Sequence, residues 1–402
     1  MLQKVRNFWI KGILEQSLYA VARLELGLTT KPEAIEDTWK ILVQRPNQIS
    51  QPLPPGTRIS STFDEFNKAL LILGAPGCGK TTLLLELTKD LLDRAERDSN
   101  QPIPVVFNLS SWVIKKFQLA NWMVDELSER YQVPRKHAQI WIDKDLIIPL
   151  LDGLDEVAPD YRSNCAEAIN AFRKKHGLVP LAVCSRVTDY EALTVKLHLQ
   201  GALVVQPLTL EQTTHYLIQA GAPLAGVRAA LQNDESLWEL LDTPLMLSVA
   251  ALAYYGRSAK EIVLTGTSEE RKSQLFAKYT EAMFSRRGKA LLYSRQKTIQ
   301  WLAWLAYTLA NHNQSVFYVE WMQPNWLSSK WQQWLVNLGA VVLSGLSGAL
   351  ICGLLYGVSG VWDKIVVVTR EVSPFFMVTI HVDISDFPEC PSCVLNFALS
   401  KG

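Results

Sequence analysis

The chain has 402 residues, of which 48% are hydrophobic and 20% are charged. This composition excludes a largely disordered chain, and the length predicts two or three domains, because domains usually contain about 100 to 150 residues. The 40 Lys and Arg residues balance 39 Asp and Glu, so no global basic field favours nucleic acid, and six scattered cysteines do not form the dense disulfide framework of a small secreted protein.

Residues 1–43 are predicted to form a helical segment. Its bulky apolar residues recur at a helical spacing and make one stripe, which consists of Trp9, Ile13, Leu14, Leu18, Val21 and Leu24. Charged residues interrupt this stretch, so it lacks the unbroken apolar centre of a secretory signal. We expect the stripe to pack against a domain, and docking on a membrane surface is the alternative. The proline-rich stretch 44–62 is predicted to be a linker.

Short apolar runs alternate with helix-length segments across residues 63–208. The runs are Ala69–Leu73, Val105–Leu109, Leu146–Leu151, Leu181–Ser185 and Leu203–Val205. Nearly continuous apolar strands separated by helices are typical of a parallel sheet covered on both faces. The sequence therefore predicts an α/β domain with helices on both faces of a parallel sheet, followed by helical regions at 209–272 and 273–334.

The first apolar run leads directly into a phosphate-binding loop. The spacing G-x-x-x-x-G-K-[ST] is met by Gly74, Ala75, Pro76, Gly77, Cys78, Gly79, Lys80, Thr81 and Thr82. A strand before the loop and a helix after it are the context that this motif requires. We expect the loop amides and Lys80 to bind phosphates, and the Thr81 hydroxyl to bind Mg²⁺. A glycine-rich turn that binds nothing is the alternative.

Carboxylates follow the third apolar run, in the sequence Asp152-Gly-Leu-Asp155-Glu156. Ligands bind at the carboxyl edge of open α/β sheets, so this cluster is predicted to face the phosphate loop. We expect Asp152 to bind Mg²⁺, and Asp155 and Glu156 to orient or deprotonate a water that attacks the γ-phosphate. A solvated acidic loop is the alternative interpretation for Asp155 and Glu156.

The fourth apolar run ends in Arg186. An arginine at the carboxyl end of a strand can sense or stabilise a γ-phosphate, and an ordinary salt bridge is the competing interpretation. The sequence thus predicts three strand ends that contribute to one site.

These motifs together, GAPGCGKTT, LLDGLDEV and CSR, followed by LTLEQ and LDTPLML, resemble those of the NACHT family of signal-transduction NTPases. The resemblance covers about Phe63 to Tyr307. It implies an ATP- or ADP-binding domain at 63–208 and a helical domain at 209–272 in which Pro244 lies beside the nucleotide base. It also implies a winged-helix-like region at 273–334 that closes over ADP.

A long uncharged stretch lies near the carboxyl end. Leu338–Val361 exceeds the roughly 20 apolar residues that cross a bilayer, so residues 335–362 are predicted to form one transmembrane helix. Residues 363–402 are predicted to be a tail. It contains a Cys390/Cys393 pair, for which we favour no metal because a second pair is missing. The cytosolic location of nucleotide and magnesium then predicts a single-pass membrane protein with the NTPase domain in the cytoplasm.

The functional hypothesis from these features is a membrane-anchored, ATP-binding molecular switch in signalling or defence. Exchange of ADP for ATP is expected to open the domains and drive self-association into a homo-oligomer, with slow hydrolysis resetting the switch. The expected cofactors are ATP or ADP and Mg²⁺, the downstream effector is unknown, and no nucleic-acid partner is expected. The alternatives are a mechanical or transport-coupled ATPase and a nucleotide-stabilised membrane scaffold without turnover.

Overall fold

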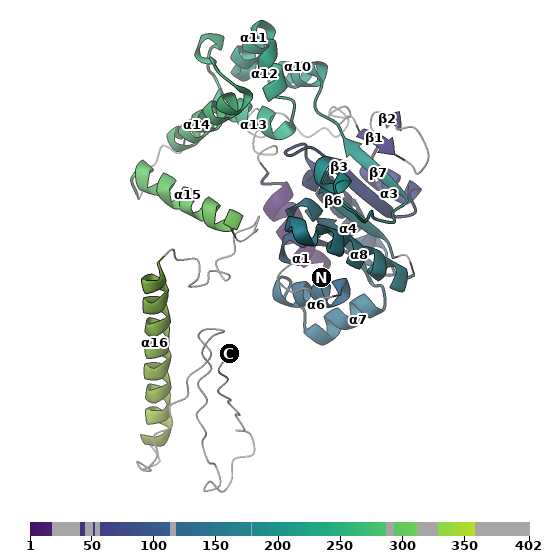
Figure 1. Cartoon of the computed structure of the whole chain (residues 1–402), viewed down its shortest axis with the longest axis vertical. Helices are drawn as coiled ribbons and strands as arrows, with labels where there is room; N and C mark the ends of the chain where they lie inside the picture. Colours follow the sequence, from purple (N-terminus) through teal and green to yellow (C-terminus); the bar gives the residue numbers. More distant parts are fainter. Residues whose placement is uncertain are drawn as a thin grey trace. The chain divides into compact units, whose positions relative to one another are not determined.

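A computed structural model describes residues 1–17, 41–44, 51–52, 57–112, 118–177, 179–286, 293–311 and 329–357. The chain divides into two compact units, Met1–Ser315 and Val316–Gly402. The first unit holds a mixed α/β part and a helical part, and the second contains the long helix α16 (Figure 1).

A mixed sheet forms the centre of the α/β part. In the described residues its strand order is β2-β1-β7-β3-β6-β5-β4 (Figure 1). The strands are β1 (Ile41–Gln44), β2 (Gln51–Pro52), β3 (Ala69–Gly74), β4 (Ile103–Asn108), β5 (Ile147–Asp152), β6 (Leu181–Arg186) and β7 (Gly201–Val205). Strands β3 to β7 are parallel, which confirms the five predicted strands, and β1 adds to β7 in the antiparallel direction. The stretch predicted as a linker thus contains β2 and contributes to an extension of the sheet.

Helices connect the parallel strands. They are α4 (Lys80–Arg97), α6 (Leu119–Glu129), α7 (Arg135–Asp143), α8 (Pro159–Lys175) and α9 (Val187–Glu191), with a short helix α3 (Ile59–Glu65) before β3. The connection from β3 to β4 runs along the sheet in one direction, and the connections from β4 through β5 and β6 to β7 run in the other. Because such crossovers are right-handed, α4 covers one face of the sheet and α6 to α9 cover the other, as predicted.

The amino-terminal segment packs onto this α/β part. It comprises α1 (Leu2–Val5) and the π-helix η1 (Arg6–Leu14), and both contact α4. Val5, Trp9 and Ile10 are buried in the same core as the strands. Of the predicted stripe, Trp9 is thus in this core, and Ile13 and Leu14 are partly buried against it, which confirms the predicted packing for these three residues. The remaining members, Leu18, Val21 and Leu24, lie outside the described residues.

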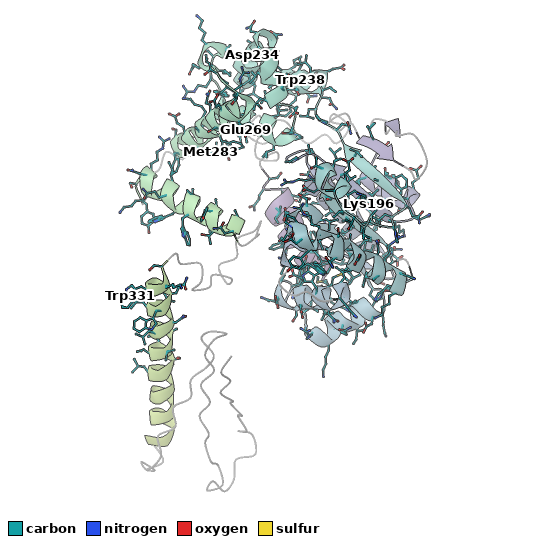
Figure 2. All side chains as sticks on the ribbon, in the orientation of Figure 1. Lys196, Asp234, Trp238, Glu269, Met283 and Trp331 are labelled. Carbon is teal, nitrogen blue, oxygen red and sulfur yellow. The ribbon has the colours of Figure 1, made fainter. Side chains whose placement is uncertain are left out.

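A second hydrophobic core lies in the helical part, between Leu208 and Leu275. Figure 2 shows this part with Asp234, Trp238 and Glu269 labelled. Its helices are α10 (Leu210–Gln219), α11 (Ala225–Asn233), α12 (Glu235–Leu240), α13 (Pro244–Ala253) and α14 (Ser268–Arg286), and α15 (Arg295–Asn311) follows. Thr209 and Gln212 form a capping box that starts α10, and Thr243 caps α13 in front of Pro244 at its first turn. The helical pattern predicted after the sheet is present.

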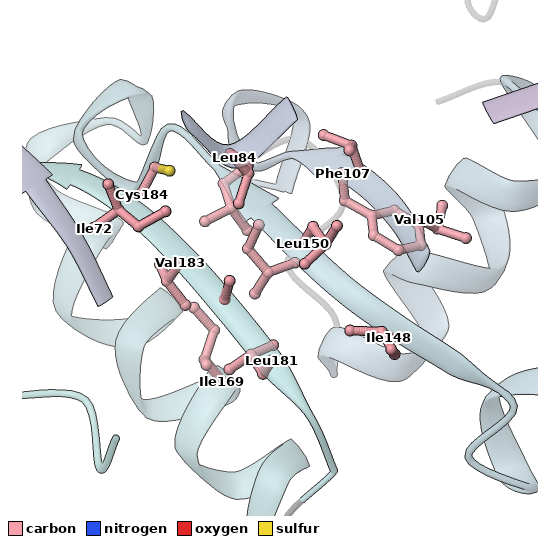
Figure 3. Close-up of a cluster of buried hydrophobic side chains, with 14 of the residues drawn as sticks. Ile72, Leu84, Val105, Phe107, Ile148, Leu150, Ile169, Leu181, Val183 and Cys184 are labelled. Atoms are coloured by element: carbon pink, nitrogen blue, oxygen red, sulfur yellow. The ribbon is translucent and has the colours of Figure 1, made fainter. Parts of the chain in front are cut away.

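The core of the α/β part lies between the sheet and its helices. Ile72 of β3, Leu150 of β5 and Val183 of β6 are fully buried, together with Leu84 of α4 and Ile169 of α8. Figure 3 shows these side chains meeting around the central strands. Burial of apolar side chains on both faces is the main stabilising contribution to such a sheet, and it holds the carboxyl ends of the strands at one edge.

The predicted transmembrane helix is corrected by the structure. The helix itself is present as α16 (Lys330–Gly357), on which Trp331 is labelled in Figure 2. Trp331 stacks with Trp334, with ring centroids 5.1 Å apart. However, none of the helices in the described ranges has the length and apolarity that a bilayer span requires. Lys330 and Asn337 are polar residues in its first turns, and residues 358–362 of the predicted span lie outside the described residues.

The predicted span at 335–362 is therefore wrong. The predicted single-pass membrane location depended on that span and is wrong with it. The predicted tail 363–402, including Cys390 and Cys393, lies outside the described residues, as do residues 312–328 of the predicted winged-helix-like region.

Candidate nucleotide-binding site

The phosphate loop connects β3 to α4 and curls back on itself. Gly77 and Gly79 have φ angles of 74° and 95°, in the left-handed region that favours glycine. Gly79 is also the amino-terminal cap of α4, so the helix starts at Lys80 with its free amides directed toward the loop. A turn of backbone amides at the amino terminus of an 18-residue helix forms an anion site, as the motif predicts.

Lys80 folds over this loop. Its Nζ donates hydrogen bonds to the carbonyl oxygens of Gly74, at 3.1 Å, and Ala75, at 3.0 Å. The ammonium group is therefore placed above the concave side of the loop by the same backbone that would surround a phosphate. A bound phosphate would offer Lys80 charged oxygens in place of neutral carbonyls, and charge-assisted bonds are the stronger kind.

Thr81 and Asp152 meet across the loop. The Thr81 Oγ1 donates to Asp152 Oδ2 at 2.9 Å. Asp152 ends β5 and its residue is only 7% exposed. The pKa of the Asp152 carboxyl is raised to about 6. Burial is the largest cause and the charges of Glu156 and Asp155 act in the same direction, while the hydrogen bond from Thr81 and the charge of Lys80 lower the pKa. A bound cation would lower the electrostatic cost of ionising this buried carboxyl beside two acidic neighbours.

This pair fits Mg²⁺ in its donor chemistry. Magnesium prefers oxygen ligands and is usually held by one or two protein groups plus substrate phosphates and water. Thr81 and Asp152 supply a hydroxyl and a carboxylate next to the loop that would hold those phosphates. Across the described part of the chain, no group of three or more His, Cys, Asp or Glu residues could hold a metal ion by itself.

The acidic loop after β5 turns at Gly153, which adopts a left-handed φ of 76°. Asp155 then contacts Arg186 twice. Arg186 Nε lies 2.8 Å from Asp155 Oδ2, and the Arg186 backbone N–H donates to Asp155 Oδ1 at 3.1 Å. The Asp155 side chain is 7% exposed whereas that of Arg186 is 47% exposed. Arg186 therefore forms a salt bridge, which is one of its two predicted roles. Its partner Asp155 is itself a predicted site residue, so this salt bridge lies where a γ-phosphate sensor is also expected.

Glu156 has a different partner. Asn108 ends β4, and its Nδ2 donates to Glu156 Oε2 at 3.3 Å, while its Oδ1 accepts from the backbone N–H of Ser110 at 2.8 Å. Sheet register pairs Asn108 with Asp152, and Gly74 with Arg186. The carboxyl ends of β3, β4, β5 and β6 therefore lie along one edge of the sheet.

Most of the predicted residues line one cavity of about 360 Å³. Its lining includes Pro76, Gly77, Gly79, Lys80, Thr81, Thr82, Asp152, Asp155, Glu156, Arg186 and Pro244. Three residues of the predicted loop lie outside this lining, namely Gly74, Ala75 and Cys78. The Cys78 side chain is buried, which raises the pKa of its thiol, and it packs where a side chain on Gly74 would have to go. Cys78 thus contributes its backbone and a buried, packed side chain to the loop, and its side chain does not line the cavity.

The helical part reaches the same cavity. Leu245 and Ser248 of α13 line it beside Pro244. The Leu245 backbone N–H donates to the Gly77 carbonyl at 3.4 Å, and a Cβ at Gly77 would lie 3.1 Å from the Leu245 side chain. Ser17, from the amino-terminal segment, also lines the cavity. The cavity is therefore lined by residues of the amino-terminal segment, the α/β part and the helical part.

Sequence reasoning missed several of these residues. Asn108 could have been found from the sequence, because a polar residue at the carboxyl end of a buried strand lies at the ligand-binding edge. Leu245 and Ser248 follow Pro244 at helical spacing but look like ordinary core residues. Arg162 of α8, which contacts the acidic loop, carried no signal, since a lone arginine on a helix is usually solvated.

A comparison with protein families agrees with this geometry. Residues 68–220 match the family model of the NACHT domain. The chain contains a NACHT domain. NACHT domains are P-loop NTPase domains, and the matched range includes the phosphate loop, Asp152, Asp155, Glu156 and Arg186. Nucleotide binding by this domain follows from the family and from the loop geometry together.

Other comparisons contribute less. No curated protein matches the chain. The Aeropyrum pernix ORC1 protein in complex with DNA is 13% identical, with a TM-score of 0.34 over 72% of this chain and 76% of that chain. The Aeropyrum pernix ORC2 protein is 11% identical, with a TM-score of 0.28 over 66% and 90%. PCH-2 of C. elegans is 14% identical, with a TM-score of 0.26 over 66% and 66%. These similarities are too low to indicate the function of this chain.

Proposed function

We propose that this protein is an ATP-dependent molecular switch in signalling or defence. ADP keeps the α/β part and the helical part together, exchange for ATP separates them, and separation allows self-association into a homo-oligomer. Slow hydrolysis returns the switch to the ADP form. The observation that carries this proposal is the composition of the cavity, which is lined by the phosphate loop on one side and by Pro244, Leu245 and Ser248 of α13 on the other.

The roles of the residues follow from their positions. Lys80 would exchange its two loop carbonyls for phosphate oxygens. Thr81 and Asp152 would hold Mg²⁺, which neutralises charge on the β- and γ-phosphates when it is bound. Glu156, oriented by Asn108, would accept a proton from or orient the attacking water, with Asp155 beside it. Pro244 would lie beside the base.

Arg186 links hydrolysis to the state of the switch. In the structure it is paired with Asp155. A γ-phosphate would compete with Asp155 for the same guanidinium, because both offer anionic oxygens. ATP, but not ADP, would therefore break the Arg186–Asp155 pair, and this difference between the two nucleotides is what a switch requires.

The test is the nucleotide content of the purified full-length protein. The switch predicts near-stoichiometric bound ADP, slow turnover, and a larger particle by light scattering after exchange into ATP with Mg²⁺. Lys80→Ala is the control and should carry no nucleotide and stay small in ATP. Rapid steady-state ATP turnover without a change in particle size would contradict the switch and favour a motor-type ATPase.

A further inference from the structure

Arg162 uses all three of its guanidinium nitrogens on the acidic loop and on α9. Its Nη2 donates to the Asp155 carbonyl at 2.6 Å and its Nε to the Val157 carbonyl at 2.7 Å. Its Nη1 contacts Asp189 Oδ1 at 2.7 Å. The Arg162 side chain is 19% exposed, so most of its surface is covered by the protein.

These bonds contribute unequally to stability. A partly exposed ion pair such as that with Asp189 contributes little to stability by itself. The two carbonyl contacts are different, since they satisfy the backbone acceptors of Asp155, within the short 3₁₀ turn Leu154–Glu156, and of Val157, directly after it. The planar fork of an arginine fits two carbonyls and a carboxylate at once, which a lysine ammonium cannot reproduce.

The contacts close a ring around Asp155. Arg162 holds the Asp155 carbonyl, and Arg186 holds the Asp155 carboxylate through both its side chain and its backbone N–H. Arg186 is in turn the amino-terminal cap residue of α9, which carries Asp189. The end of β5 is thus tied to the end of β6 by Arg162 on one side and by the Arg186–Asp155 pair on the other.

We propose that Arg162 is a positioning residue of the nucleotide site, which keeps the acidic loop and the Arg186 strand end in register when Arg186 leaves Asp155 for the γ-phosphate. The proposal rests on the proposed function for its consequences in hydrolysis. During that exchange the Arg186–Asp155 pair is lost, and the Arg162 contacts remain to hold Asp155, Glu156 and α9 in place. Small displacements of catalytic groups cost up to about 100-fold in rate, so this support matters for turnover.

The first experiment needs no nucleotide. Amide hydrogen exchange is compared in the nucleotide-free full-length wild type and Arg162→Gln. The proposal predicts at least tenfold faster exchange in peptides covering 153–158 and 185–191, including the Arg186 amide, and unchanged exchange in β3. Arg94→Gln, which removes an arginine ion pair to Asp64 near the end of α4, is the matched control and should leave both peptides unchanged. Unchanged exchange in Arg162→Gln would overturn the proposal.

The second experiment separates binding from chemistry. Arg162→Gln should reduce single-turnover ATP hydrolysis 10- to 100-fold while the Kd for a fluorescent ATP analogue stays within about threefold. Asp189→Asn, which leaves both carbonyl contacts, should lose much less, and Arg162→Lys should recover only part of the rate. Equal losses of affinity and rate would indicate general damage to the fold and overturn the proposal. A wild type that binds ATP without hydrolysing it would remove the resetting step of the proposed function, and the exchange experiment would then decide the role of Arg162 alone.

Discussion

Asp152 is ionisable, buried and surrounded by two further carboxylates, and its pKa of about 6 lies above the 3.8 of an unperturbed aspartate. The folded state therefore binds a proton more tightly than the unfolded state does. The stability that this group contributes is fully present below about pH 4 and is lost as the pH rises through about 6. For a group so completely buried, the loss amounts to roughly 3 kcal/mol.

We predict that this loss appears in urea unfolding of the nucleotide-free protein in EDTA. Between pH 4 and pH 7 the free energy of unfolding of the wild type should fall by roughly 3 kcal/mol relative to Asp152→Asn, which cannot ionise. The comparison cancels the titration of other groups that both proteins share. Parallel pH profiles for the two proteins would show that the Asp152 carboxyl is not destabilised by burial.

At the scale of elements, the amino-terminal segment is held to the α/β part by a short chain of buried hydrogen bonds. Trp9 Nε1 donates to the Tyr131 hydroxyl at 2.7 Å, and that hydroxyl donates to the Val106 carbonyl of β4 at 2.6 Å. Arg6 adds contacts with Asp93 and Glu96 of α4. The segment thus spans from the edge strand to the helix that begins at the phosphate loop.

Tyr131→Phe tests this attachment. The substitution keeps the ring but leaves the Trp9 indole N–H and the Val106 carbonyl each without this partner, so we expect a loss of about 2 kcal/mol in the free energy of unfolding. Trp9→Phe is the companion variant, because it removes the donor and some volume while Tyr131 keeps its bond to Val106. Chemical denaturation measures both. A loss below about 0.5 kcal/mol for Tyr131→Phe would mean that water replaces the chain of bonds without cost.

The first unit contains two hydrophobic cores, and residues from both the α/β part and the helical part line one cavity. The Leu245 backbone N–H donates to the Gly77 carbonyl at 3.4 Å, so the helical part touches the α/β part at the phosphate loop. A ligand in the cavity would contact both parts. Ligand binding to the native state stabilises whatever it contacts, by about 2.7 kcal/mol at a concentration 100 times the Kd.

We therefore predict that ADP at 100 times its Kd slows amide hydrogen exchange in both parts. Peptides from the phosphate loop and from α13 should be protected together, whereas Lys80→Ala, which removes the phosphate contact, should show no protection at the same concentration. Protection confined to the phosphate loop would mean that α13 does not close over the nucleotide. That result would leave nucleotide binding intact but contradict the closed state of the switch.

Much of the α/β part was predictable from the sequence. Each parallel strand is a short apolar run between helix-length segments, and the phosphate loop carries its chemistry in nine consecutive residues, Gly74 to Thr82. Such features depend on neighbours in the chain, so local spacing is enough to recognise them. The predicted transmembrane helix shows the limit of this reasoning, because an uncharged stretch predicts helix formation more securely than it predicts the environment of that helix.

The sequence by itself determined that this protein has a parallel sheet, a phosphate loop and an acidic strand end, since these follow from periodicity and short motifs. Only the tertiary structure decided which side chains face one another. Asn108 meets Glu156, Arg186 meets Asp155, and Arg162 holds the loop between them, across sequence separations of 48, 31 and 7 residues. The first two contacts arise because β5 lies between β4 and β6 in the sheet, and strand order is set by the packing of the whole core.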